Sequence, residues 1–229
     1  MAIEVPDRFW GWQGIDPFAL PIRQRCQGYF QECHVVLHPF YRKVFHDHYH
    51  FERNYELAYP LIERVTWKEV MSAIEAPDPA ALARAIVRMD GTKTDKATEQ
   101  LHARLLGHCS HCDLLGPNWQ EDRIPLDMLV LFGRFLLRHG YRSANLVTGG
   151  YPSSIREVGL VANELFRAVS ESPSNIAMFT ADMAYALKLD YHDLPFSWLL
   201  SNGAAPDGIL EEIGFEGFRA DDQLTAAWF

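Results

Sequence analysis

The sequence predicts an all-α fold, a compact multi-helix bundle with short connecting helices, formed by one domain over residues 1–229. Three observations predict it. Apolar residues recur at a spacing of three to four over most of the chain, and helix-start signals precede several of these stretches. Strand-like alternation is nearly absent. With 48% hydrophobic residues, the chain has enough apolar material for a packed core.

Charge and hydropathy argue against two classes of partner. The 21 basic and 30 acidic side chains give a net charge of -9, which would repel a phosphate backbone, so we expect no nucleic acid partner. No apolar run reaches the roughly 18 residues that a membrane span needs. The N-terminus lacks a basic region followed by an apolar one, so it does not read as a secretory signal, and we expect a cytoplasmic location.

Two long helices are expected in the first quarter of the chain. Asp16 and Pro17 are typical of a helix start, and an apolar stripe then continues to Leu37. Residues 40–58 have a helical period that ends near Pro60.

Three short helices are expected next, each with its own start or stop signal. Thr66 and Glu69 have the spacing of a capping box. Asp78 and Pro79 open a helix that stops at Asp90-Gly91, and a third runs from Lys93–Asp95 through Cys109.

The second half of the chain is also expected to be helical. Residues 126–138 are apolar nearly all round, which predicts a buried central helix capped by Gly140. Ser154–Glu157 has capping-box spacing and predicts a helix to about Val169. A further helix is expected to carry Ile176, Phe179, Met183 and Leu187 on one side. The aromatic arm (residues 1–16) and the tail (201–229) should pack on this domain or on a partner.

The chemistry-bearing side chains concentrate between His34 and Glu56, which hold five of the ten histidines. Imidazole is a common ligand of zinc, iron and copper. Two pairs of histidines are one helical turn apart, His34 with His38 and His46 with His50. Each pair could therefore bind one metal ion. The alternative is that these histidines are partly exposed and partly buried with hydrogen-bonded partners.

The helical register favours one subset of this segment. His48, Glu52 and Glu56 follow the side of the helix that also carries apolar residues, so we expect them to point inward as metal ligands. Arg53 and Tyr55 are then expected to position a substrate.

Glu99 and His102 have a second metal-ligand spacing. Di-iron and di-manganese bundles contribute a Glu-x-x-His pair from each of two helices. This chain has only one clear copy. It predicts an iron or manganese site formed with His48, Glu52 and Glu56.

Cys109 and Cys112 form a Cys-x-x-Cys pair flanked by His108 and His111. Two sulfurs at this spacing can bind one zinc ion or form a disulfide with each other. There is no second Cys-x-x-Cys in the chain to complete a structural zinc site. The alternative is a helix terminus with buried thiols.

The segment Arg53-Asn-Tyr-Glu-Leu-Ala-Tyr-Pro60, followed by short helices and Glu99-x-x-His102, resembles the early helices of the haem-oxygenase-like superfamily. The resemblance implies a helical bundle with an internal polar pocket. The later Asp-x-x-His helix of that superfamily is not evident, because Asp190-Tyr-His192 has a different spacing.

These patterns predict a metal-dependent enzyme, a non-haem oxidoreductase that carries out an oxidative or cofactor-modifying reaction on a small molecule. The rival prediction is a non-catalytic accessory or scaffold subunit that docks on a larger protein through its aromatic termini. A zinc-stabilised interaction module at Cys109 and Cys112 is a third hypothesis. A homo-oligomer is compatible with each.

Overall fold

The structure is a computed structural model that describes residues 23, 29–42, 63–87, 95–117, 126–148, 154–170, 176–189, 195–202 and 207–221. The chain folds into two compact units. Unit 1 comprises residues 1–37, 122–192 and 196–228, and unit 2 comprises residues 38–121, 193–195 and 229. Along the sequence, unit 2 is therefore mainly one continuous segment that interrupts unit 1.

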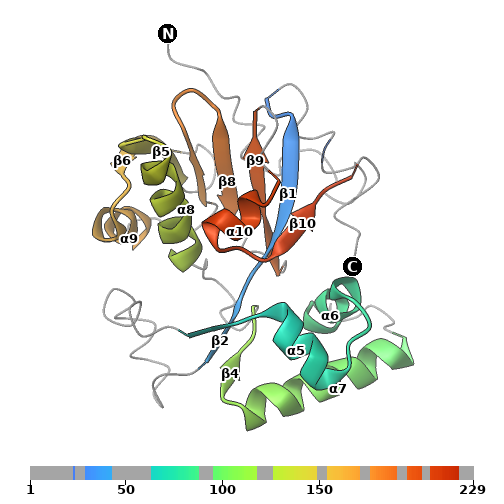
Figure 1. Cartoon of the computed structure of the whole chain (residues 1–229). Coiled ribbons are helices and arrows are strands. Elements are labelled where there is room, and N and C mark those ends of the chain that lie inside the picture. The colour runs from blue at the N-terminus through green and yellow to red at the C-terminus, as the bar shows by residue number, and fades with distance from the viewer. Residues whose placement is uncertain are drawn as a thin grey trace. The chain divides into compact units, whose positions relative to one another are not determined.

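Unit 1 contains a seven-stranded antiparallel sheet, seen face-on in Figure 1. Its strands lie in the spatial order β10-β1-β9-β8-β7-β5-β6. Their bounds are Glu32–Leu37 (β1), Ser143–Thr148 (β5), Ser154–Gly159 (β6), Ile176–Phe179 (β7), Tyr185–Leu189 (β8), Phe196–Ser201 (β9) and Gly217–Arg219 (β10). β1 therefore pairs with the last two strands of the described chain.

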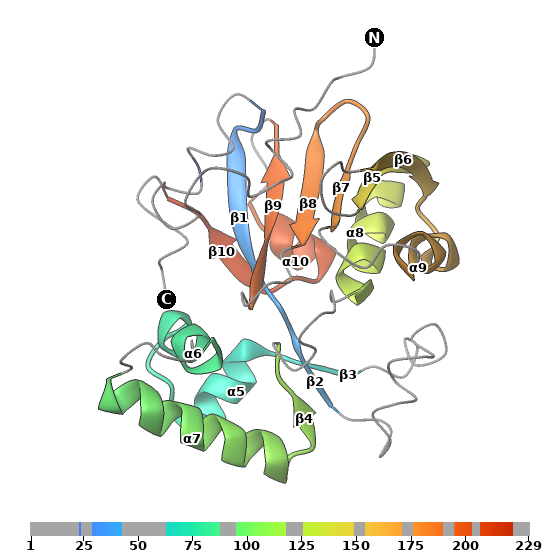
Figure 2. The same ribbon diagram turned by 180° about the vertical axis from the view of Figure 1, so that it is seen from behind.

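Three described helices accompany this sheet: α8 (Leu126–Arg138), α9 (Ala162–Ser170) and α10 (Ile209–Ile213). α8 and α10 lie on the same face of the sheet, in front of it in Figure 1 and behind it in Figure 2. The ring of Phe135 on α8 meets the ring of Tyr185 on β8 edge-on, with centroids 5.2 Å apart. Tyr185 therefore identifies the helix-covered face.

Two interior strands of this sheet, β1 and β9, are buried on both faces. All six residues of β9 and five of the six in β1 are buried. A strand buried on both faces has no polar face, so its sequence loses the alternation that marks a half-buried strand. The prediction of an all-α bundle is therefore wrong, and the fold combines helices with a large antiparallel sheet.

Several predicted helices are strands. The end of the first predicted helix is β1, and the beginning of the second is β2 (Phe40–Arg42). The second capping box, Ser154–Glu157, lies in β6, and helix α9 begins only at Ala162. The predicted stripe from Ile176 to Leu187 is divided between β7 and β8, so its helical spacing is coincidental.

Unit 2 combines a small sheet with three helices. The sheet has the order β3-β2-β4, where β3 is Glu63–Val65 and β4 is Leu114–Leu115. The helices are α5 (Trp67–Ile74), α6 (Pro79–Ile86) and α7 (Lys96–His111). Trp67 is buried with its ring edge-on to Phe40, and its Nε1–H donates to the carbonyl oxygen of His38 at 2.7 Å.

The predicted helix starts in unit 2 are confirmed. Thr66 and Glu69 form a reciprocal capping box at α5. The Asp78 carboxylate accepts from the amide of Ala81 at 2.7 Å, with Pro79 in the first turn of α6. Asp95 caps α7 in the same way. α6 ends at Ile86, and the predicted stop at Asp90-Gly91 lies outside the described residues.

In unit 1 the helix predicted over residues 126–138 is confirmed as α8, and Gly140 follows it with φ +88°. The arm of residues 1–16 lies outside the described residues, and the tail is described only at 201–202 and 207–221. The prediction of a single domain with a docked arm and tail stays a prediction. Within the described residues, no helix combines the length and apolar character that a bilayer crossing requires.

Candidate functional site

A group of polar side chains with two unpartnered buried atoms lies on the helix-covered face of unit 1. In the pairing of β1 with its neighbours, His34 is opposite Arg219 of β10, and Glu32 is opposite Ser201 of β9. Ser201 is also opposite Tyr185 of β8. Residues directly opposite, or two apart on a strand, share a face. We refer to Glu32, His34, Tyr185, Ser201 and Arg219 as the His34 cluster.

Two polar atoms of the His34 cluster are buried without a hydrogen-bond partner, Nδ1 of His34 and Oγ of Ser201. The residues are 9% and 1% exposed. They are diagonal neighbours on adjacent strands, which places their Cβ atoms within about 8 Å of each other. Each unpaired buried group costs about 1–3 kcal/mol unless a partner supplies the missing hydrogen bond.

An ion pair lies beside these two atoms. Arg219 donates from Nε and Nη2 to the two carboxylate oxygens of Glu32, at 2.7 and 2.6 Å. The Glu32 side chain is largely buried, whereas that of Arg219 is exposed. This two-point contact ties β10 to β1 and fixes both charges next to His34.

Burial lowers the pKa of His34 from its ordinary value. The Glu32 carboxylate raises this pKa and the Arg219 guanidinium lowers it, so the two charges act in opposite directions. The net pKa is lowered, and the imidazole is therefore neutral at neutral pH. A neutral imidazole carries one nitrogen that can accept a proton.

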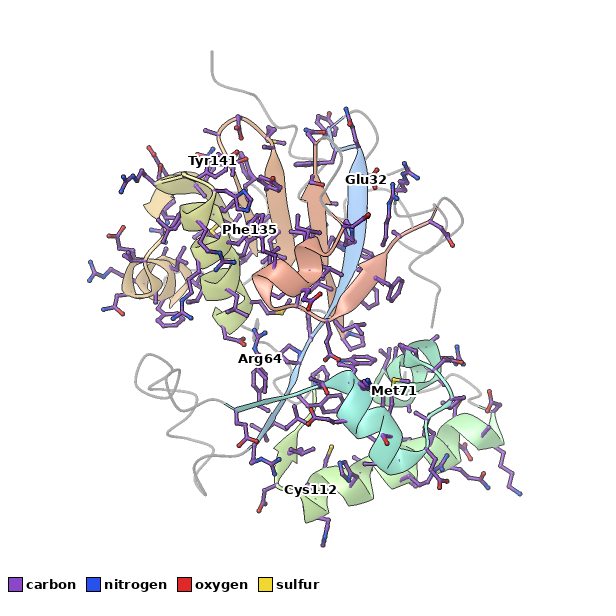
Figure 3. All side chains as sticks on the ribbon, in the orientation of Figure 1. Glu32, Arg64, Met71, Cys112, Phe135 and Tyr141 are labelled. Atoms are coloured by element: carbon purple, nitrogen blue, oxygen red, sulfur yellow. The ribbon has the colours of Figure 1, made fainter. Side chains whose placement is uncertain are left out.

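A second polar group lies at the same end of the sheet. Figure 3 shows Glu32 at the beginning of β1 and Tyr141 beyond the end of α8. The Tyr141 hydroxyl donates to Asp182 at 3.0 Å, and burial together with this bond raises the pKa of Tyr141 to about 12. The Tyr141 ring is edge-on to Tyr185, so aromatic contacts join this group to the His34 cluster.

The C-terminal end of α8 is fastened to α10 close to these rings. His139 and Glu212 are in contact through Nε2 and Oε1 at 2.9 Å, and Arg138 donates to the Glu212 carbonyl oxygen at 2.7 Å. The ring of His139 also lies 6.0 Å from that of Tyr185. These contacts hold α8 and α10 in fixed positions over the sheet.

The predicted Glu99 and His102 ligands lie on α7 in unit 2. Nδ1 of His102 is 2.6 Å from the carbonyl oxygen of Ala85, so this histidine fastens α7 to α6. Glu99 is exposed. Among the residues that the structure describes, no group of three or more His, Cys, Asp or Glu side chains could hold a metal ion. The helical bundle predicted around this pair is wrong, because the larger unit is built on a seven-stranded sheet, whereas the iron or manganese ion stays a prediction.

The other predicted site residues lie outside the described residues: His48, Glu52 and Glu56 as ligands, and Arg53 and Tyr55 as substrate-positioning residues. Their individual assignments stay predictions. His46 and His50 also lie outside this part of the chain.

The predicted metal-binding pair of His34 and His38 is not on a helix. His34 belongs to β1 in unit 1, whereas His38 follows that strand and belongs to unit 2. Burial lowers the pKa of His38 to about 3. His38 is therefore a neutral core residue, and its backbone carbonyl anchors Trp67.

Sequence reasoning found His34 but missed the rest of its cluster. Ser201 and Arg219 lie 167 or more positions along the chain from His34, and no local pattern connects them. One signal was present: Glu32 and His34 are two apart, which places them on the same face if the segment is a strand. Assigning the segment to a helix concealed that relation.

The fold and the His34 cluster define this chain as a two-unit protein whose larger unit is an antiparallel sheet with a buried polar group under its helices. The family model described as a protein of unknown function (DUF2711) matches residues 19–229, and the chain belongs to that family. The comparisons with curated proteins and with solved structures gave no match. The seven-stranded sheet also removes the helical bundle that the haem-oxygenase-like resemblance implied.

Proposed function

We propose that this chain is an enzyme that acts on a small polar molecule by proton transfer at the His34 cluster. His34 is the proton acceptor in this proposal, and the Ser201 hydroxyl is the neighbouring group from which a proton is taken. The proposal retains the small-molecule substrate expected from the sequence and dispenses with the helical-bundle metal site.

One observation carries the proposal: Nδ1 of His34 and Oγ of Ser201 are both buried and unpartnered on one face of adjacent strands. Buried polar atoms nearly always have partners, and the exceptions call for an explanation such as a catalytic role. Apolar side chains at these two positions would make the fold more stable. Retaining two costly polar atoms on one face of adjacent strands is typical of a site where stability is traded for function.

The charge state of His34 suits this role. A general base must be unprotonated at the working pH, and burial keeps the pKa of His34 below its ordinary value. A hydroxyl that gives its proton to a neutral imidazole becomes a nucleophile towards an acyl or similar electrophilic carbon. The nearby Arg219 guanidinium is exposed, so it can attract an anionic part of the bound molecule.

The test combines stability with reactivity. We expect Ser201→Ala to leave the free energy of unfolding unchanged or raise it by about 1–3 kcal/mol, because it removes an unpaired buried hydroxyl. We expect the wild-type chain to hydrolyse p-nitrophenyl acetate above the solution background, and we expect this variant and His34→Leu to lose that hydrolysis. Urea titrations give the stability and release of p-nitrophenolate gives the rate.

Ser197→Ala is the matched control for stability. Ser197 lies on the same strand and the same face as Ser201 and is also fully buried, but it has an interaction partner. Removing the Ser197 hydroxyl should therefore lower the free energy of unfolding of unit 1. His111→Gln, which removes an exposed histidine of unit 2, is the control for reactivity.

The proposal fails if Ser201→Ala destabilises the chain as Ser197→Ala does while the hydrolysis rate stays at the wild-type level. That result would make Ser201 and His34 ordinary core residues. The rival accessory-subunit hypothesis depends on the aromatic termini, which lie outside the described residues, and it stays a prediction.

A further inference from the structure

The C-terminal turn of α7 carries the Cys-x-x-Cys pair of unit 2. Cys109 lies in the last turn of the helix, and Cys112 is the residue that caps its C-terminus. Both cysteines are half-buried, neither is in a disulfide, and both lie in the part of the chain that the structure describes. They are three positions apart, so they share one side of the helix, with Cβ atoms about 5–6 Å apart.

Cys112 has a neighbour that can take its proton. The Sγ atom of Cys112 lies 3.7 Å from Nδ1 of His108, one turn earlier on the same helix. When Nδ1 is the unprotonated nitrogen, the thiol donates to it. A thiolate is the reactive form of cysteine, and the imidazole of His108 is placed to accept the proton of the Cys112 thiol.

A cationic side chain lies close to the same sulfur. Arg42 of β2 is paired with Leu114 of β4, two residues after Cys112. The pKa of Arg42 is raised first by its bond with Glu63, and the charge of a Cys112 thiolate adds to that rise.

The backbone at Cys112 can accommodate a bond to Cys109. A disulfide requires Cβ atoms about 3.5–4.5 Å apart, so the two residues must approach by about 1–2 Å. Cys112 has already left helical geometry, with φ -98° and ψ 6°, and the next residue, Asp113, has φ +53°. The approach therefore requires movement at the end of a helix and leaves its interior intact.

We propose that Cys109 and Cys112 form a reversible intramolecular disulfide by exchange with a low-molecular-weight disulfide such as oxidised glutathione. The Cys112 thiolate, after giving its proton to His108, attacks one sulfur of the small disulfide and releases one thiolate. The Cys109 thiolate then attacks the Cys112 sulfur and releases the second. The two protein sulfurs lose two electrons, the small disulfide gains them, and the two thiol protons end on the two released thiols.

The chain provides a direct readout of this reaction. Trypsin cuts after Arg104 and Arg123, so both cysteines fall within one peptide, residues 105–123. The full-length protein is incubated in a series of oxidised to reduced glutathione ratios, quenched in acid, unfolded, alkylated and digested. We expect the 105–123 peptide to change from doubly alkylated to unalkylated with the loss of two hydrogens, and to return with excess reduced glutathione. Cys33, which is buried, should stay a thiol throughout and be alkylated at every ratio.

Two variants separate the roles of the side chains. We expect His108→Gln to slow the reaction of Cys112 with 5,5′-dithiobis(2-nitrobenzoate) at neutral pH by about fivefold, the rate equivalent of one hydrogen bond. This comparison is made in a Cys109→Ser background, where the first step is isolated. His111→Gln is the matched control and should react at the rate of the parent, because the contact with the Cys112 sulfur is made by His108. Far-UV circular dichroism verifies that each variant is folded.

Three results would overturn the proposal. The 105–123 peptide could stay doubly alkylated at every glutathione ratio, or His108→Gln could react as fast as its parent. Alternatively, the purified protein could carry one zinc ion per chain that is released by Cys112→Ser, which would make the pair a metal site. None of these results depends on the His34 cluster, so this inference and the proposed function are tested separately.

Discussion

Burial determines the charge of two histidines that lie four residues apart. His38 is almost entirely buried, and its pKa falls to about 3 from 6.5. His34 is shifted in the same direction, but the charges of Glu32 and Arg219 also act on it. The same residue type therefore has a structural role at one position and, in our proposal, a catalytic role at the other. Only the neighbouring side chains distinguish the two.

Replacing His38 should change how stability depends on pH. Its pKa is lower in the folded than in the unfolded chain, so acid protonates the unfolded state first and favours unfolding. This one group should reduce the free energy of unfolding as pH falls from about 6.5 towards about 3, by at most about 1.4 kcal/mol per pH unit. In His38→Leu that contribution should disappear. Urea titrations of both proteins between pH 7 and pH 4 measure it, and parallel pH profiles would contradict the assignment.

Helix glycines show how packing decides the effect of an identical substitution. Gly107 on α7 has no atom within 4 Å of the position where a Cβ would be added. At Gly133 on α8, an added Cβ would lie 3.1 Å from Leu165 Cδ1 and 3.2 Å from the Leu160 carbonyl oxygen. Gly133 thus allows the close approach of α8 to the segment that leads into α9.

Alanine at these two positions should have opposite effects. We expect Gly107→Ala to stabilise unit 2 by up to about 1 kcal/mol, because alanine is the better helix former. We expect Gly133→Ala to destabilise unit 1 by about 1–3 kcal/mol, because the backbone carbonyl of Leu160 cannot move aside freely. Chemical denaturation measures both changes. A gain in stability from Gly133→Ala would contradict this expectation, because it would show that Leu160 can move to make room for the methyl group.

The molecule as a whole consists of two compact units, each with its own buried residues. The chain leaves unit 1 after Leu37 and returns to it at Asp122. Leu146 is fully buried in the large sheet of unit 1, and Leu82 is fully buried on α6 of unit 2. This matched pair allows the two cores to be perturbed separately.

We expect Leu146→Ala and Leu82→Ala to act on different unfolding transitions. Each substitution leaves a cavity and should cost its own unit about 2–5 kcal/mol. Differential scanning calorimetry should show Leu146→Ala lowering the transition of unit 1 and Leu82→Ala lowering that of unit 2. A single transition shifted equally by both variants would show that the units unfold as one cooperative body.

The sequence was most informative where structure depends on neighbouring residues. The capping hydrogen bonds of Thr66, Asp78 and Asp95 are made within three residues, so their spacing predicts them directly. α8 was predicted from its apolar composition, and its bounds agree with the structure. The strands were missed because burial on both faces removes the alternation that identifies them.

The order of the amino acids was sufficient to locate the helix starts of unit 2, because capping is a short-range interaction, and to show that the chain has enough apolar residues for a core. The sheet and the candidate site depend instead on tertiary structure. Glu32 and Arg219 are separated by 187 positions, yet their side chains form two hydrogen bonds because β1 pairs with β10. Strand pairing brings distant residues together through backbone hydrogen bonds, which every residue except proline can donate. The His34 cluster therefore follows from the order of the strands, which no local pattern in this sequence specifies.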